Sequence, residues 1–103
     1  MRVISLRTLR EFWEIHPDAE IPLRTWYRIA LHATWQNLQE VRLTFPHADA
    51  VHTPSGTPSG TLTVFNIRGN HYRLITRIRY NHQAITIRDI LTHEDYDRGD
   101  WRN

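Results

Sequence analysis

The chain has 103 residues, of which 40% are hydrophobic and 23% are charged, as expected for one globular domain. It contains no cysteine, which excludes disulfides and thiolate metal sites, and it has no run of about 20 apolar residues that could span a membrane. The formal net charge is +2, and all thirteen cationic side chains are arginine. The first residues lack the apolar core of a signal peptide, so we expect a cytoplasmic protein.

The start of the chain predicts a short strand followed by a helix. Residues 2–5 include two adjacent β-branched side chains, which favour a strand. Thr8 and Glu11 have the spacing of a capping box, and Pro17 is expected to end the helix that they begin. One apolar stripe runs along this helix, through Leu9, Phe12 and Trp13.

Two further helices are predicted before the middle of the chain. Asp18 is placed to cap a helix over about 19–33, whose apolar stripe consists of Leu23, Trp26, Tyr27 and Ala30. Asn37 and Glu40 can cap a shorter helix that Pro46 ends.

Residues 46–60 are expected to form a flexible loop, because Thr-Pro-Ser-Gly occurs there twice in succession. Too little chain follows for a second domain, so residues 1–103 are predicted to fold as one unit. The remaining elements are strands at about 62–67, 71–80 and 84–91 and a capped helical turn over 92–97. This order predicts an α+β fold in which the N-terminal helices pack on one face of a small twisted antiparallel sheet, with a short C-terminal helix.

The strand over 71–80 alternates regularly between two kinds of side chain. One face carries Tyr72, Leu74, Thr76, Ile78 and Tyr80, and the other carries His71, Arg73, Ile75, Arg77 and Arg79. Three guanidiniums in a row repel one another, so an anionic ligand such as phosphate explains them better than fold stability does. Alternatively, these arginines are simply solvated or pair with the acidic residues that follow position 93.

Pairing with the neighbouring strands extends this basic face. A hairpin between strands 71–80 and 84–91 is expected to place Arg88 on it. A two-residue turn at Gly69-Asn70 would place Asn66 opposite Arg73, whereas a three-residue turn would not.

His93 and Tyr96 stand three residues apart in the C-terminal helical turn and therefore share a face. The turn directly follows the last strand, so both side chains are expected at the end of the basic face. An imidazole and a phenol can transfer protons, and arginine can stabilise the charged phosphorane formed when RNA is cleaved by its own 2′-hydroxyl. His93 and Asp97 also have the spacing of two metal ligands, but no third ligand is placed by spacing, and the alternative is a surface or capping histidine.

Several stretches together resemble the HigB-type toxins of the RelE-like superfamily of toxin–antitoxin systems. The resemblance is strongest at Phe65-Asn66-Ile67-Arg68-Gly69-Asn70-His71-Tyr72-Arg73-Leu74 and at Thr92-His93-Glu94-Asp95-Tyr96-Asp97. It extends to Met1-Arg2-Val3-Ile4-Ser5, to Leu9-Arg10-Glu11-Phe12-Trp13 and to His16-Pro17-Asp18-Ala19-Glu20.

The resemblance implies a RelE-like fold and a small endoribonuclease that needs no cofactor and no metal. Its substrate would be mRNA in the A site of the small ribosomal subunit, and its partner a HigA-type antitoxin with a helix-turn-helix fold. By position, the resemblance implies catalytic roles for Arg73, His93 and Tyr96. It implies RNA-binding roles for Arg68, Asn70, Arg77 and Arg79, to which the basic face adds His71 and Arg88.

Two other functions fit the same pattern. One is a module that binds RNA or the ribosome through the arginine face without cutting. The other is an interaction protein whose basic face only docks an acidic partner. Codon preference, strict ribosome dependence, the identity of the general base, the oligomeric state and the antitoxin docking surface are not readable from these residues.

Overall fold

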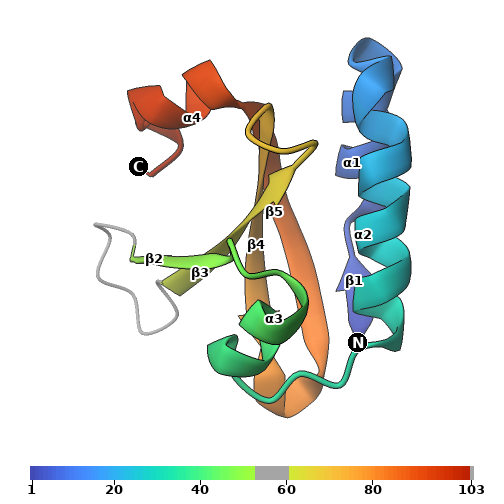
Figure 1. The fold of residues 1–103 in the computed structure, drawn as a ribbon, viewed down its shortest axis with the longest axis vertical. Helices are drawn as coiled ribbons and strands as arrows, with labels where there is room; N and C mark the ends of the chain where they lie inside the picture. The colour runs from blue at the N-terminus through green and yellow to red at the C-terminus, as the bar shows by residue number, and fades with distance from the viewer. Residues whose placement is uncertain (53–60, 103) are drawn as a thin grey trace.

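A five-stranded sheet runs through the middle of the molecule, with helices on both of its faces (Figure 1). The computed structural model describes residues 1–52 and 61–102. Its elements are β1 (Arg2–Ile4), α1 (Leu6–Ile15), α2 (Glu20–His32), α3 (Leu38–Thr44), β2 (Asp49–His52), β3 (Thr61–Ile67), β4 (Tyr72–Arg79), β5 (Ala84–Thr92) and α4 (His93–Arg98). Single 3-10 turns lie at Pro17–Ala19, Tyr80–His82 and Asp100–Arg102.

The strand order is β1-β5-β4-β3-β2, and the predicted α+β class is confirmed. The strands from β2 to β5 pair antiparallel, as expected for consecutive strands joined by short connections. The sheet is nevertheless mixed rather than purely antiparallel, because β1 pairs parallel to β5. The added strand covers an edge of β5 and brings Val3 next to Ile85, inside the core on the helix side.

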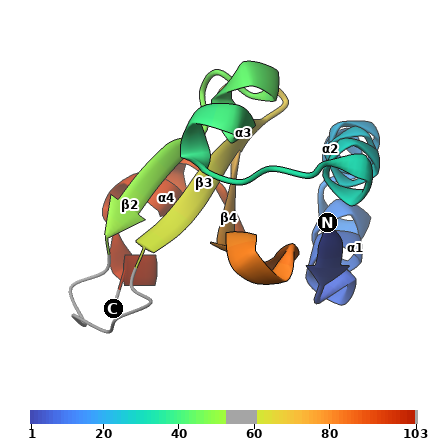
Figure 2. The same ribbon diagram turned by 90° about the horizontal axis from the view of Figure 1, so that it is seen from below.

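The helices α1, α2 and α3 cover one face of the sheet and bury the main core against it (Figures 1 and 2). The predicted stripe of α2 is confirmed, since Leu23, Trp26 and Ala30 are almost completely inaccessible to solvent. The Trp26 and Phe65 rings meet edge to face with their centroids 5.3 Å apart. Among the described residues, no helix is long and apolar enough to cross a membrane.

A smaller apolar cluster lies on the opposite face of the sheet. Leu62, Val64 and Ile75 form it, and side chains of β2, of β5 and of the C-terminal segment pack against them. Figure 2 shows α1 and α2 on one side of the sheet and α4 on the other. On β4 this cluster and the arginines share one face, because Ile75 lies between Arg73 and Arg77.

The hairpin between β3 and β4 has the register of a two-residue turn, with Asn66 opposite Arg73. The positive φ angles of this turn belong to Arg68 (52°) and Gly69 (63°) rather than to Gly69 and Asn70.

The β4–β5 hairpin contains a bulge that the alternating pattern did not predict. Ile75 pairs with Asp89 and Thr76 pairs with Ile87, so Arg88 has no partner in the ladder. The unbroken register from which Arg88 was predicted to share a face with the arginines of β4 is therefore wrong, and the placement of Arg88 on that face stays a prediction.

The predicted caps of α1 and α2 are wrong. The residue before α1 is Ser5, in a left-handed conformation with φ of 74°, and Glu11 accepts a hydrogen bond from the Arg7 side chain at 2.7 Å instead of capping. Asp18 lies in a 3-10 turn and makes no cap to α2. The cap of α3 is confirmed, because Asn37 Oδ1 accepts from the backbone N–H of Glu40 at 3.0 Å.

The loop predicted over 46–60 contains a strand. Residues 49–52 form β2, which pairs with β3 and places Val51 against Leu62 and Val64. The residues on either side of Val51 do not show the alternation of apolar and polar side chains that predicts a strand, so this strand was not predicted. The Thr-Pro-Ser-Gly repeat at 53–60 lies outside the described residues.

The burial of two leucines predicts different tolerance to truncation. Leu74, in the central strand β4, has no exposed surface, and we expect Leu74→Ala to lower the free energy of unfolding by about 2–5 kcal/mol. Leu43, on α3, is 85% exposed, and Leu43→Ala is expected to change it by less than about 0.5 kcal/mol. Urea unfolding of the two variants measures both values, and equal losses would contradict this assignment of the core.

Candidate functional site

The C-terminal helix is held against one end of the basic sheet face. Thr92 caps α4 by accepting from the backbone N–H of Asp95 at 3.2 Å, and the N–H of His93 donates to the carbonyl of His71 at 2.9 Å. This second bond joins the start of α4 to the β3–β4 turn, and both lie at the same end of the sheet (Figure 1). Tyr96 and Trp101 stack with centroids 4.9 Å apart and rest on the apolar cluster around Ile75.

The three residues predicted to be catalytic meet at this junction. Arg73 Nη2 lies 3.5 Å from Nδ1 of His93, and the Arg73 guanidinium carbon lies 5.6 Å from the centroid of the Tyr96 ring. The side chains come from β4 and from one face of α4, as the three-residue spacing predicted. The side chain of His93 is 51% exposed, so a ligand can reach it.

The partners of His93 indicate which of its nitrogens carries a proton. Arginine can only donate, so Nδ1 accepts from Arg73 and the proton is assigned to Nε2. Nε2 lies 3.4 Å from Oδ2 of Asp97, a suitable acceptor. In the part of the chain that the structure describes, no third His, Cys, Asp or Glu joins this pair as a possible metal site.

Neutral acceptors hold the Arg73 guanidinium. Nη1 donates to the carbonyls of Asn70 at 3.0 Å and Tyr72 at 3.3 Å, and Nη2 lies 3.4 Å from Oδ1 of Asn70. No carboxylate pairs with it among the described residues. The guanidinium is therefore oriented while its charge stays available for an anion.

Some arginines of the described residues form ion pairs and others do not. The pairs are Arg7–Glu11, Arg24–Glu20, Arg42–Asp49 and Arg98–Asp95 from the helices and Arg68–Asp18 from the β3–β4 turn, while Arg10 and Arg28 on α1 and α2 form none with any described residue. The described arginines of the β strands have no such partner, namely Arg2, Arg73, Arg77, Arg79 and Arg88. Of the acidic residues that follow position 93, Asp95 pairs with Arg98 and Asp97 lies beside His93, and among the described residues none forms an ion pair with an arginine of β4.

One carboxylate does lie on the basic face. Asp89 is opposite Ile75, and its Oδ1 accepts from the backbone N–H of Ile90 at 2.8 Å. Burial raises the pKa of Asp89, the bond from Ile90 opposes this effect, and the nearby Asp95 adds to it. The carboxylate is thus less readily ionised than an exposed aspartate.

Arg68, predicted to bind RNA, is engaged within the protein. Its guanidinium lies 3.1 Å from Oδ2 of Asp18, and the Tyr72 hydroxyl donates to Oδ1 of Asp18 at 2.6 Å. The Tyr72 hydrogen bond lowers the pKa of Asp18, partial burial opposes it, and the Arg68 charge lowers it further. The same bond and burial raise the pKa of Tyr72. These contacts tie the α1–α2 connection to the β3–β4 turn.

A surface cleft of about 540 Å³ adjoins the Arg73–His93 contact. It is lined by His16, Asn70, His71, Tyr72, Thr92, His93 and Glu94. The structure thus brings the predicted residues Asn70 and His71 beside the catalytic candidates, whereas Arg79 lies at the other end of β4. Sequence reasoning named His16 only within a stretch that carries the family resemblance; its ring stacks on Phe12 at 4.4 Å and no local pattern marks it as part of a site.

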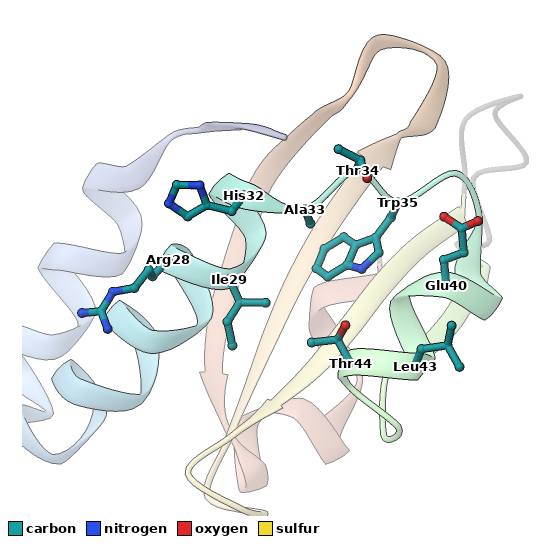
Figure 3. Close-up of a pocket in the computed structure, with 9 residues that line it drawn as sticks. All are labelled: Arg28, Ile29, His32, Ala33, Thr34, Trp35, Glu40, Leu43 and Thr44. Atoms are coloured by element: carbon teal, nitrogen blue, oxygen red, sulfur yellow. The ribbon is translucent and has the colours of Figure 1, made fainter.

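A second, larger cleft of about 640 Å³ lies between α2 and α3 (Figure 3). Trp35 lies between the two helices at its base, with Ile29 on one side and Leu43 on the other. None of the residues predicted to act in catalysis or RNA binding lines it.

One family model matches most of the chain. The family model for HigB toxins, described as the RelE-like toxic component of a toxin–antitoxin system, matches residues 19–99. The curated proteins give no significant match.

The contacts of Asp18 predict a pH-dependent contribution to stability. Because the folded protein lowers the pKa of Asp18, its ionised form stabilises the fold at pH values above the unfolded pKa of about 3.9, and this contribution is lost as the pH falls through the lower folded value. We expect Asp18→Asn to lower the free energy of unfolding at pH 7 and the difference from wild type to vanish toward about pH 2. Tyr72→Phe should behave alike, since it removes the largest cause of the shift. Urea unfolding across this pH range is the measurement, and a difference that is constant with pH for both variants would contradict the assignment.

Proposed function

We propose that this chain, which belongs to the HigB toxin family of RelE-like toxic components of toxin–antitoxin systems, is an endoribonuclease that cleaves mRNA on the translating ribosome. The single observation that carries the proposal is the meeting of Arg73, His93 and Tyr96 at the end of a sheet face whose described arginines form no ion pair.

The proposed reaction is attack by the RNA 2′-hydroxyl on its own phosphodiester. A base removes the hydroxyl proton, the O2′–P bond forms, and the P–O5′ bond breaks as an acid protonates the leaving oxygen. The products are a 2′,3′-cyclic phosphate and a 5′-hydroxyl end. His93 and Tyr96 are the two proton-transfer groups beside Arg73, and either order of base and acid is compatible with their positions.

Arg73 is suited to stabilise the phosphorane. Its contacts to the backbone carbonyls of Asn70 and Tyr72 orient the guanidinium before substrate arrives. Its 3.5 Å contact with His93 is long for a hydrogen bond, so a phosphate oxygen can replace it at little cost. No step in this scheme requires a metal, because the chain itself supplies both proton-transfer groups and the cation.

The remaining arginines of β4 would hold the RNA backbone. Arg77 and Arg79 continue the line from Arg73 along the strand, and Asn70 and His71 line the cleft beside His93. Arg68 can contribute only by exchanging its contact with Asp18 for a phosphate. Membership of the family implies an antitoxin; we propose a helix-turn-helix protein of the HigA type, in a type II system acting in the cytoplasm.

Substitution of the catalytic candidates tests the proposal. In cells that express the chain without an antitoxin, Arg73→Ala and His93→Ala should each relieve growth arrest. Loss of the oriented guanidinium is expected to slow cleavage by about 10²–10³-fold and loss of the imidazole by about 10²–10⁴-fold. Primer extension on a reporter mRNA measures cleavage directly.

Arg24→Ala is the matched control, because it removes an exposed arginine that pairs with Glu20 on the opposite side of the molecule. Arrested translation with intact message in the wild type would favour the RNA-binding module that does not cut. If both site variants still arrest growth and cut mRNA as the wild type does, the assignment of the site is wrong.

A further inference from the structure

The basic face continues past the catalytic candidates to a second cluster of cations at the opposite end of the sheet. β4 carries Arg77 and Arg79 toward the β4–β5 turn, where β1 adds Arg2 on the far side of β5. Figure 1 shows this end of the sheet remote from α4. A strand rises about 3.3 Å per residue, so Arg79 lies about 20 Å from Arg73 along β4.

The strand register arranges this cluster around a hollow, here called the cradle, which is lined by Arg2, Ile4, Arg79, His82, Ala84 and Thr86. Ala84 pairs with Arg79 on one side and with Arg2 on the other, so three neighbouring strands place arginine, alanine and arginine in one row. Two strand spacings separate the two arginines by about 10 Å at the backbone. Ala84, which is 4% exposed, lines the hollow between them.

A second row lies beneath the first. Thr86 pairs with both Arg77 and Ile4, which puts a hydroxyl at the centre and another arginine at the side. The resulting hollow of about 450 Å³ is lined by Arg2, Ile4, Arg79, His82, Ala84 and Thr86. No carboxylate lines it.

The cradle has no internal partner for its charge. Among the described residues, Arg2 and Arg79 form no ion pair, although four of the five paired arginines find a carboxylate within seven residues in the chain. Both arginines are exposed at the rim. Fold stability alone does not account for two unpaired cations that face each other across an alanine.

We infer that this cradle is a second anion subsite, which holds the phosphodiester backbone of the RNA at a distance from the bond that is cut. The inference rests on the proposed function and extends it. Arg2 and Arg79 contact phosphate from two sides, Thr86 donates its hydroxyl, and His82 adds a donor from the turn. Continuity of the basic face through Arg77 favours one RNA strand that spans both subsites over a separate acidic partner.

Binding of oligonucleotides of two lengths tests the inference. The probes are a 12-nucleotide and a 3-nucleotide 2′-O-methyl RNA, which lack the attacking hydroxyl and therefore stay intact. The full chain with Arg2→Gln and Arg79→Gln should bind the 12-nucleotide probe about tenfold more weakly. The slope of its log affinity against log salt concentration should decrease in magnitude by about 1.4, which is about 0.7 for each of the two phosphates that an arginine no longer neutralises. Affinity for the 3-nucleotide probe should change by less than about twofold, since that probe reaches only the Arg73 end.

The matched control carries Arg10→Gln and Arg28→Gln, which remove two exposed arginines from α1 and α2 without touching the basic face. Thr86→Glu is an independent variant that places a negative charge inside the cradle, and it should weaken binding of the longer probe at least as much. Replacing Arg2 and Arg79 by lysine should restore most of the salt dependence, because counterion release depends on the charge rather than on the geometry of the guanidinium.

The outcomes separate this inference from the proposed function. If the Arg2 and Arg79 variant binds the 12-nucleotide probe as the control does, the subsite is refuted while the nuclease proposal stands. If the variant loses binding of a helix-turn-helix antitoxin but keeps that of the probe, the cradle serves an acidic protein surface and the inference is equally refuted. If the wild type neither binds the probes nor cuts mRNA, the proposed function fails and the subsite fails with it.

Discussion

The candidate site depends on how the last helix crosses to the face of the sheet that α1 and α2 leave open. Two contacts hold it there: the backbone bond from His93 to His71, and the apolar packing of Tyr96 and Trp101 against Ile75. The first fixes where α4 begins and the second fixes which way its side chains face. Without both, the imidazole would lie on a mobile end of the chain, far from the guanidinium of β4.

The basic face shows how a sheet can keep charges that a helix surface would neutralise. Arg7 and Arg24 each find a glutamate four residues away, as helix periodicity allows. On β4 the residues two positions away on the same face are Ile75 or another arginine, so alternation denies the strand a local counterion. Backbone carbonyls at the turn orient Arg73 instead, which restricts its motion without cancelling its charge.

Much of this arrangement was predictable from the sequence. Period-two alternation in β4 separated Leu74 from Arg73, and three-residue spacing grouped His93 with Tyr96; both patterns reflect local geometry that tertiary structure rarely overrides. Contacts between distant segments were not predictable. Asp18 looked like a helix cap, yet its carboxylate binds Tyr72, which is 54 positions away. Likewise, the parallel pairing of β1 with β5 depends on packing that no local pattern encodes.

The bulge at Arg88 has a consequence for how freely this domain can change in length. Ile85 and Ile87 face the helices at a spacing of two, but the next core residue is Ile90, three positions on, because the bulge takes up one residue. The bulge therefore determines which face of the sheet each later residue of β5 occupies, including Leu91, and the direction in which α4 begins. Loss of Arg88 itself would restore simple alternation and leave Asp89 and Ile90 on their present faces, whereas loss of another residue while the bulge stays in place would reverse the faces of the residues between them. Among related chains, a change of one residue in the length of β5 should thus occur at the bulge more often than elsewhere in the strand.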